Sequence, residues 1–342
     1  MDHDSKSKQL VSVLLPVLNE EACIGGILLQ LRKQSYEEIE ILVADGGSSD
    51  ATREIVSRHA EDDPRVQLLD NPRRLQSAGL NAALHIAKGD VLVRVDGHSF
   101  VERDYVERCV DVLENTAAEV VGGRMLAKPI DERIARGVAI ANEAPWGAGP
   151  AQFHRDGEAG PVDTVYLGTF VTDRVRELGG WAEDVGVNED YEMNYRIRAA
   201  GGTVWFDPAL SVGYQPRRTL HAVAKQYFRY GRSKATVLRR HPSSARARQL
   251  IPTLGIPGAI IALMPYERPS QRAIVFLLRL GILGHALAIA FFGIRSSRSS
   301  RVGTAAASAA WLMHWTWSAG FWFGVVRPFP SADQYKTLPP RS

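Results

Sequence analysis

The chain has 342 residues, of which 45% are hydrophobic and 23% are charged, and its formal net charge is +3. These values exclude a disordered chain, because the apolar content is sufficient for a core and the net charge is small. The two cysteines, Cys23 and Cys109, are too few for a disulfide scaffold or a four-cysteine zinc site. The length is sufficient for about two domains, and the net charge gives no indication of nucleic-acid binding.

The positive and negative charges are divided between two parts of the chain. Residues 1–216 contain 22 Lys and Arg against 36 Asp and Glu, a net charge of −14. Residues 217–342 contain 19 against 2, a net charge of +17. Ten basic and no acidic residues lie between Arg217 and Arg248, directly before an apolar segment. This asymmetry predicts that the basic part faces a membrane or a polyanion.

The N-terminal part alternates short apolar runs with segments of helical spacing. We predict strands at residues 10–18, 39–44, 66–69 and 90–95, and helices at residues 20–34, 52–59 and 75–87. Apolar strands separated by helices indicate a parallel, doubly wound α/β sheet with helices on both faces. Ligands bind to such sheets at the carboxyl ends of the strands. The loops after Leu18, Ala44 and Val95 are therefore the first candidates for a functional site.

The C-terminal third contains long apolar segments. Residues 273–293 and 304–326 comprise 21 and 23 residues, close to the ~20 that cross a bilayer. Residues 250–264 comprise only 15 and include Pro252 and Pro257, so they form a kinked span, a re-entrant segment or an interfacial helix. The alternative is a helical hairpin buried in a soluble domain.

Charge predicts the orientation of these segments. The basic run should face the cytosol. If residues 250–264 also span, the loop with Arg295, Arg298 and Arg301 faces the cytosol too, and if they do not, this loop lies outside. The first arrangement fits the positive-inside rule better. We therefore expect three spans and a multi-pass protein of the cell membrane. The first nine residues, MDHDSKSKQ, lack the apolar region of a secretory signal peptide, so we expect the N-terminal domain in the cytosol.

The loops after the predicted strands carry acidic residues and no glycine-rich phosphate-binding motif. The sequence contains no G-x-x-x-x-G-K-[ST] loop and no G-x-G-x-x-G after the first strand, which argues against a P-loop enzyme and a standard dinucleotide fold. Instead, Asp45 and Asp96 end predicted strands, and His98 and Asp190 follow. Two such carboxylates can bind a nucleotide and a divalent cation, and an imidazole favours Mn²⁺ over Mg²⁺. Taken singly, each Asp is more often a helix or turn cap.

Taken together and in order, these residues lie in a series of matching stretches. The stretches are residues 11–21 (VSVLLPVLNEE), 45–52 (DGGSSDAT), 78–83 (AGLNAA), 87–90 (AKGD), 96–98 (DGH), 179–181 (GGW) and 188–196 (NEDYEMNYR). On them the chain resembles the inverting family 2 glycosyltransferases over about residues 10–240. The resemblance implies the GT-A fold, a Rossmann-like α/β fold whose mostly parallel sheet carries helices on both faces. The C-terminal third, including residues 313–321 (MHWTWSAGF), resembles the succinoglycan-biosynthesis (ExoA-like) branch.

The resemblance implies a divalent cation, Mn²⁺ or Mg²⁺, and a role for each matching residue. Asp190 is the expected catalytic base, and Asp96 and His98 are the expected metal ligands. The expected contacts to the nucleotide sugar are Pro16, Glu20, Asp45 and Asp96, and those to the acceptor or its diphosphate are Glu189, Gln226, Arg229 and Tyr230. Arg229 has an alternative interpretation as a member of the basic, membrane-proximal run.

Three positions depart from the family pattern. His98 stands where a second Asp is commoner, which leaves the identity of the metal open. Tyr230 replaces a Trp, although a Tyr can still stack on a sugar. Residues 168–171 (GTFV) lack an Arg often seen in the family, which leaves acceptor recognition there open.

These features predict an N-terminal tail at residues 1–9, a GT-A domain at 10–240 and a membrane domain at 241–342. The expected activity is transfer of a hexose, with glucose as one candidate, from a UDP-sugar to a lipid-linked (polyprenyl-diphosphate) saccharide in exopolysaccharide or cell-envelope synthesis. One alternative is a polyprenyl-phosphate sugar synthase or a processive polysaccharide synthase. An alternative of another class is a catalytically inactive scaffold that binds a nucleotide sugar.

Overall fold

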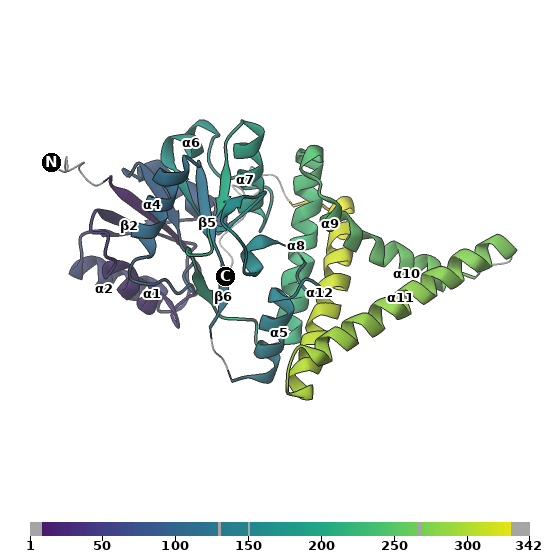
Figure 1. Ribbon diagram of the computed structural model, residues 1–342. Helices are drawn as coiled ribbons and strands as arrows, with labels where there is room; N and C mark the ends of the chain where they lie inside the picture. Colours follow the sequence, from purple (N-terminus) through teal and green to yellow (C-terminus); the bar gives the residue numbers. More distant parts are fainter. Residues whose placement is uncertain (1–8, 129–130, 150, 266–267, 330–342) are drawn as a thin grey trace.

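A central β-sheet organises the N-terminal part of the protein (Figure 1). The structure is a computed structural model that describes residues 9–128, 131–149, 151–265 and 268–329, so the predicted tail lies outside it except for Gln9. Within these residues the main sheet has eight strands, in the order β3-β2-β1-β4-β8-β5-β9-β7. They are β1 (Val11–Val17), β2 (Ile39–Asp45), β3 (Val66–Asp70), β4 (Val91–Arg94), β5 (Val120–Gly123), β7 (Gly160–Pro161), β8 (Tyr166–Val171) and β9 (Val204–Phe206).

The half of the sheet that the sequence predicts is parallel. β1 lies between β2 and β4, β3 pairs with β2, and all of these pairs are parallel. In the other half β8 runs antiparallel to β4 and β5, β9 runs parallel to β5, and β7 runs antiparallel to β9. A small parallel sheet joins β6 (Met125–Ala127) to β10 (Val212–Tyr214). This architecture confirms the predicted GT-A α/β fold.

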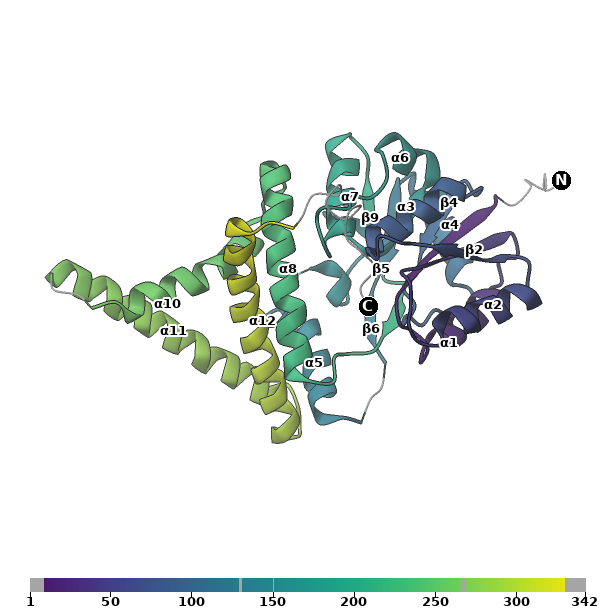
Figure 2. The same cartoon turned by 180° about the vertical axis from the view of Figure 1, so that it is seen from behind.

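Helices cover both faces of the main sheet (Figures 1 and 2). One face carries α1 (Ile24–Arg32), α2 (Thr52–Asp62) and α4 (Tyr105–Thr116), and the other carries α3 (Gln76–Ile86), α6 (Thr172–Glu177) and α7 (Glu189–Ala199). Successive side chains of a strand point to opposite faces, so Val13 and Leu15 of β1 enter the first core and Leu14 enters the second. Because both faces are covered, β1 and β2 are buried along their whole length, which explains why both are mainly apolar. The strands and helices predicted before residue 96 are all present.

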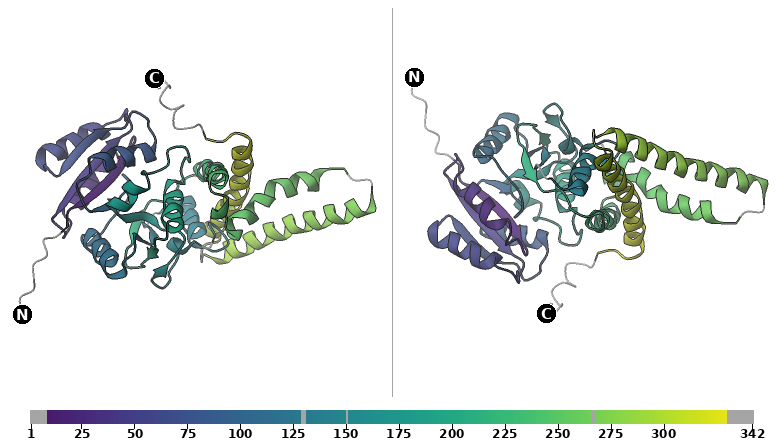
Figure 3. Two further views of the ribbon diagram at one scale, coloured as in Figure 1. Left: turned by 90° about the horizontal axis from the view of Figure 1, so that it is seen from above. Right: turned by 90° about the horizontal axis from the view of Figure 1, so that it is seen from below.

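The remaining helices form a separate layer beside the sheet domain. They are α5 (Arg133–Glu143), α8 (Leu220–Arg240), α9 (Ala247–Leu250), α10 (Gly255–Leu263), α11 (Pro269–Arg295) and α12 (Ser300–Val326), with short 3₁₀ turns at Gln152–His154, Pro242–Ser244 and Ile251–Leu254. α8 and α12 lie side by side, and α5 packs against α12 (Figures 1 and 2). α10 and α11 extend away from this layer and converge at their far ends (Figure 3).

Small residues let α12 approach its neighbours closely. A Cβ atom added at Gly231 of α8 would lie 2.0 Å from the carbonyl oxygen of Trp317, and one added at Gly320 would lie 2.0 Å from that of Phe228. A Cβ atom at Gly137 of α5 would lie 2.6 Å from the backbone nitrogen of Ala306. Backbone therefore contacts backbone along α12, as in tightly packed helix pairs.

The structure does not confirm three membrane spans. One helix in the described part of the chain is long and apolar enough to cross a membrane, namely Ser270–Arg295 within α11. Ile251–Leu263 forms a shorter apolar helix, and the predicted span at 304–326 lies in α12, where ten residues are buried. α11 keeps large apolar side chains exposed, so it is not the buried hairpin of the soluble alternative.

Candidate active site

The loops after β1 and β2 are joined at the carboxyl edge of the sheet. The Asn19 N–H donates to Ser48 Oγ over 2.8 Å, and Asn19 Oδ1 accepts from the Ser49 N–H over 2.8 Å. The Glu20 N–H donates to Thr52 Oγ1 over 2.8 Å. These bonds make the two loops one surface, at the edge where α/β sheets bind ligands.

Asp45, the last residue of β2, is buried and shapes its own turn. Its carboxylate accepts from the backbone N–H of Gly47 over 2.9 Å and of Ser48 over 3.1 Å, and it pairs with Arg53 at 2.8 Å. Burial raises the pKa of Asp45, but the hydrogen bonds from Ser48 and Arg53 together hold it below its usual value. The carboxylate is therefore ionised at neutral pH. Its contact with a uracil or ribose stays a prediction.

Asp96 lies two residues after the end of β4, and its two carboxylate oxygens have different contacts. Its Oδ1 accepts from Gln76 Nε2 over 2.9 Å and lies 3.2 Å from Nη2 of Arg94, the last residue of β4. Its Oδ2 has no hydrogen bond to the described residues, and the side chain is 12% exposed. One oxygen is thus held by the protein, while the other is open to a ligand.

Glu189 and Asp190 form the first turn of α7, where the helix dipole favours negative charge. Arg94 Nη1 lies 3.1 Å from Glu189 Oε1 and makes a close ion pair with Asp190. Burial raises the pKa of Asp190 and raises that of Glu189 to about 7, while the Arg94 charge opposes both shifts. The Asp190 side chain is 20% exposed, so a hydroxyl group can reach it.

His98 and Glu20 form a pair beside Asp96. His98 Nδ1 lies 3.0 Å from Glu20 Oε1, and this hydrogen bond raises the pKa of His98. Metal-binding histidines usually donate their second ring N–H to a carboxylate, which fixes the ring and leaves Nε2 for the metal. No cluster of three or more His, Cys, Asp and Glu in the described ranges could hold a metal by itself. That Asp96 and His98 hold a cation whose other ligands are substrate phosphates and water stays a prediction.

The predicted acceptor residues on α8 differ in their contacts. Gln226 Nε2 donates to Tyr230 Oη over 2.7 Å, and Asn188 Nδ2 donates to the Tyr230 carbonyl oxygen over 3.3 Å. The first bond lies within α8, and the second joins α8 to the loop before α7. Arg217 Nε donates to Gln226 Oε1 over 3.2 Å. Arg229 is exposed and has neither an ion pair nor a hydrogen bond with the part of the chain that the structure describes.

Pro16 of β1 pairs in register with Ala44 of β2 and lies under α3. A Cβ atom added at Gly79 of α3 would lie 3.2 Å from Pro16 Cβ and 3.3 Å from Ala44 Cβ. Gly79 therefore brings α3 close to the sheet at this point. The place of Pro16 beside the nucleotide stays a prediction.

Comparisons with known proteins give the family of this chain. Residues 12–171 match glycosyl transferase family 2. The chain is 33% identical over 326 residues to the succinoglycan biosynthesis protein ExoA of Rhizobium meliloti (strain 1021). The alignment covers 94% of this chain and 97% of that protein. The chain belongs to glycosyl transferase family 2.

Two further proteins are similar to this family 2 chain. A dolichyl N-acetyl-alpha-D-glucosaminyl phosphate 3-beta-D-2,3-diacetamido-2,3-dideoxy-beta-D-glucuronosyltransferase of Methanococcus voltae is 24% identical over 240 residues, covering 67% of this chain and 74% of that protein. The mannosyltransferase PcManGT from Pyrobaculum calidifontis, solved with GDP-Man and Mn²⁺, superimposes with a TM-score of 0.59 at 20% identity, covering 91% of this chain and 88% of that chain. The second likeness supports the fold.

Arg94 and Gln76 belong to the cluster of this family 2 chain, although the sequence analysis did not predict them. Arg94 is the one charged residue in the run VLVRV at residues 91–95. A charge in a strand that is buried on both faces requires partners, and this was an available signal. Gln76 carried no such signal, because a polar residue at the start of an amphipathic helix is ordinary.

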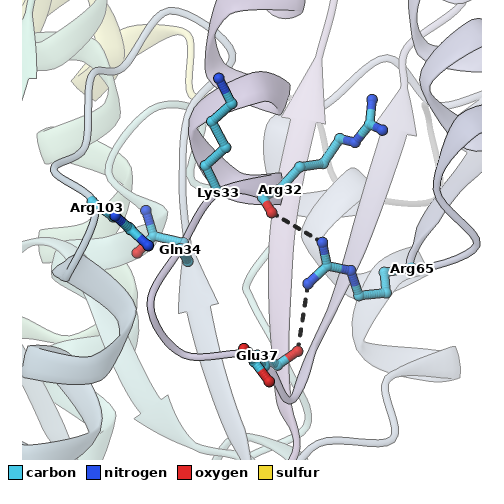
Figure 4. A pocket seen from close by; sticks show the side chains of 6 residues that line it. All are labelled: Arg32, Lys33, Gln34, Glu37, Arg65 and Arg103. Carbon is cyan, nitrogen blue, oxygen red and sulfur yellow. Dashed lines mark hydrogen bonds between the residues drawn. The ribbon is translucent and has the colours of Figure 1, made fainter.

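A hollow at the opposite edge of the sheet is lined mostly by basic side chains (Figure 4). It lies near the starts of β2 and β3 and is lined by Arg32, Lys33, Gln34, Glu37, Arg65 and Arg103. Arg32 and Arg65 already pair with Asp63, at 3.1 Å and 2.9 Å. The hydrogen bond from Arg65 is the main reason that the pKa of Asp63 falls to about 2. The hollow contains no predicted site residue, so we place the site at the carboxyl edge.

Proposed function

We propose that this glycosyltransferase moves a sugar from a UDP-sugar to a lipid-linked saccharide, with inversion at the anomeric carbon. Family membership and the relative in succinoglycan biosynthesis support polysaccharide synthesis as its setting. The observation that carries the proposal is the cluster of Asp96, Glu189 and Asp190 around Arg94, beside His98. Asp96, on the donor side, and Asp190, on the acceptor side, then both contact the side chain of Arg94.

In this mechanism Asp190 is the base. Its carboxylate takes the proton of the acceptor hydroxyl group while that oxygen attacks C1 of the sugar. The bond between C1 and the diphosphate breaks on the opposite face, and its electron pair leaves with the diphosphate, so the configuration inverts. The base must be ionised, and the charge of Arg94 favours the ionised form.

Other residues of the edge would hold the donor and the acceptor. A divalent cation, Mn²⁺ or Mg²⁺, held by Asp96 and His98 would supply positive charge to the diphosphate leaving group. Glu20 would orient His98, and Pro16 and Asp45 would lie beside the nucleoside. On the acceptor side, the proposed contacts are Glu189, Gln226, Arg229 and Tyr230.

We infer that α10 and α11 enter a membrane while the catalytic domain stays on the cytosolic side. Phe276, Leu280 and Phe291 of α11 are exposed, and apolar surface of this extent marks an interaction site. With 27 residues α11 is about 40 Å long, enough for a hydrocarbon core of about 30 Å. With 9 residues α10 is about 14 Å long and too short to span. The basic residues of α8 would face the anionic lipid surface.

The test uses the full-length protein in lipid vesicles with a panel of radiolabelled UDP-sugars, lipid extracted from the source membranes, and Mn²⁺ present or absent. We expect one UDP-sugar to label a lipid-linked saccharide only when the cation is present. Label on a polyprenyl phosphate with no saccharide would support the sugar-phosphate synthase instead. A long polymer would support the processive synthase, and UDP-sugar binding without transfer would support the inactive scaffold.

A further inference from the structure

Arg94 is a charged side chain placed inside the sheet. It is the last residue of β4, lies in register with Leu14 of β1, and is 3% exposed. A buried cation is strongly unfavourable unless carboxylates pair with it in good geometry. Its position therefore requires a specific set of partners.

The guanidinium group of Arg94 has a different partner on each side. Nη2 and Nε face Asp96 Oδ1, at 3.2 Å and 3.4 Å. Nη1 faces the start of α7, where it lies 3.1 Å from Glu189 Oε1 and contacts Asp190. One rigid, planar group thus joins the loop after β4 to the first turn of a helix that lies far away in the sequence.

This geometry links the two halves of the proposed reaction. Asp96 belongs to the donor side and Asp190 to the acceptor side, and the sugar carbon must lie between them during transfer. The fixed shape of a guanidinium group sets a distance between two carboxylates, whereas the ammonium group of a lysine is a point charge on a flexible stem. Small errors in such a distance slow a reaction severely.

We propose that Arg94 is a positioning residue that holds the Asp190 carboxylate at a fixed place relative to the Asp96 carboxylate. This inference rests on the proposed function, because it takes Asp190 as the base of the transfer reaction. It assigns to Arg94 no contact with the substrate. Its effect is on the rate of transfer, and the affinity for the nucleotide depends on other residues of the edge.

The chain offers a matched control for the test. Arg174 of α6 also pairs with two carboxylates, Glu119 at 2.7 Å and Glu177 at 3.0 Å, and its side chain is 21% exposed. It lies outside the proposed site. Arg174→Lys therefore reproduces the chemical change of Arg94→Lys in an ion-pair cluster that contains none of the proposed site residues.

The experiment compares Arg94→Lys, Arg94→Met and Arg174→Lys with the wild-type protein in vesicles. It measures kcat and KM for the UDP-sugar, UDP binding by calorimetry, and thermal unfolding. We expect Arg94→Lys to lower kcat about 100-fold and to change the UDP dissociation constant less than about threefold. Arg174→Lys should leave kcat, KM and the UDP dissociation constant unchanged and should lower only the thermal stability. Arg94→Met removes the charge as well, and if it does not fold, Arg94→Lys carries the test.

Two results would overturn the inference while leaving the proposed function intact. One is an Arg94→Lys variant that keeps its kcat within about threefold of the wild type. The other is a parallel loss of kcat, UDP affinity and thermal stability, which would make Arg94 a purely structural residue. Absence of transfer by the wild-type protein would instead remove the proposed function, and the inference with it.

Discussion

The carboxyl edge of the sheet buries charged residues, whereas the hairpin of α10 and α11 exposes apolar ones. At the edge, the charged residues Arg94, Asp45 and Glu189 lie inside the protein. Along the hairpin, the apolar residues Phe276 and Leu277 are 65% and 64% exposed. Each arrangement is unfavourable in water alone. In the function that we propose, an ionic substrate binds at the first region and lipid covers the second.

The largest expected effect comes from the buried charges of the edge. Asp96→Asn should lower kcat/KM for sugar transfer by about 1,000-fold or more, because the donor side loses its anionic oxygen. Mn²⁺ should then no longer raise the affinity for UDP, which calorimetry measures. Asp173→Asn makes the same change on α6, where the side chain is 86% exposed, and should alter neither value. If Mn²⁺ still raises the affinity of the Asp96→Asn variant for UDP, Asp96 is not a metal ligand.

A substitution on α11 tests whether its exposed apolar residues contact lipid. Leu277→Glu places a charge where lipid is expected, which is unfavourable by about 3 kcal/mol at the centre of a span. Binding to vesicles, measured by flotation, should weaken by tenfold or more, by that same estimate. Ile86→Glu on α3, where the side chain is 36% exposed, is the control and should bind vesicles normally. Equal binding of both variants would mean that α11 does not contact the lipid.

A third variant distinguishes α12 from α11. Gly320→Ala should lower the free energy of unfolding by about 2 kcal/mol, because the added Cβ would lie 2.0 Å from a backbone oxygen of α8. Gly281→Ala on α11 meets nothing within 4 Å and should be neutral or stabilising by up to about 1 kcal/mol. Thermal unfolding in micelles measures both. Similar values for the two variants would indicate that α12 is a free membrane span.

The smallest expected effect concerns a buried ion pair far from the site. The folded-state pKa of Asp63, about 2, lies below the unfolded value of about 3.9. Its contribution to stability is therefore complete above about pH 4 and is lost as the pH falls towards 2. Asp63→Asn should lower the free energy of unfolding by about 1–2 kcal/mol at pH 7 and by almost nothing at pH 2. A destabilisation that is the same at both pH values would contradict this assignment.

The sheet could be predicted from the sequence because its signals are local. β1 and β2 are mainly apolar runs, Asp45 ends β2, and Asp96 comes two residues after β4. The site role of Asp190 came from the resemblance to a family, since nothing local distinguishes it from an ordinary acidic residue at a helix start. The structure adds its pairing with Arg94.

The environment of α12 could not be predicted, because hydropathy does not distinguish lipid from a neighbouring helix. Ala306 and Gly320 are suited to either environment, and only the contacts with α5 and α8 show which one they have. Arg229 shows a related limit. A sequence motif joined it to Gln226 and Tyr230, yet only those two side chains bond to each other on α8.

The most direct test of the account is the rate of sugar transfer by Asp190→Asn in a single turnover. The substitution keeps the size of the side chain and removes its ability to accept a proton as a base. We predict that the rate falls by about 1,000-fold or more relative to the wild type, while the affinity for UDP is unchanged. Transfer at the wild-type rate would contradict the assignment of Asp190 as the base, and with it the proposed mechanism.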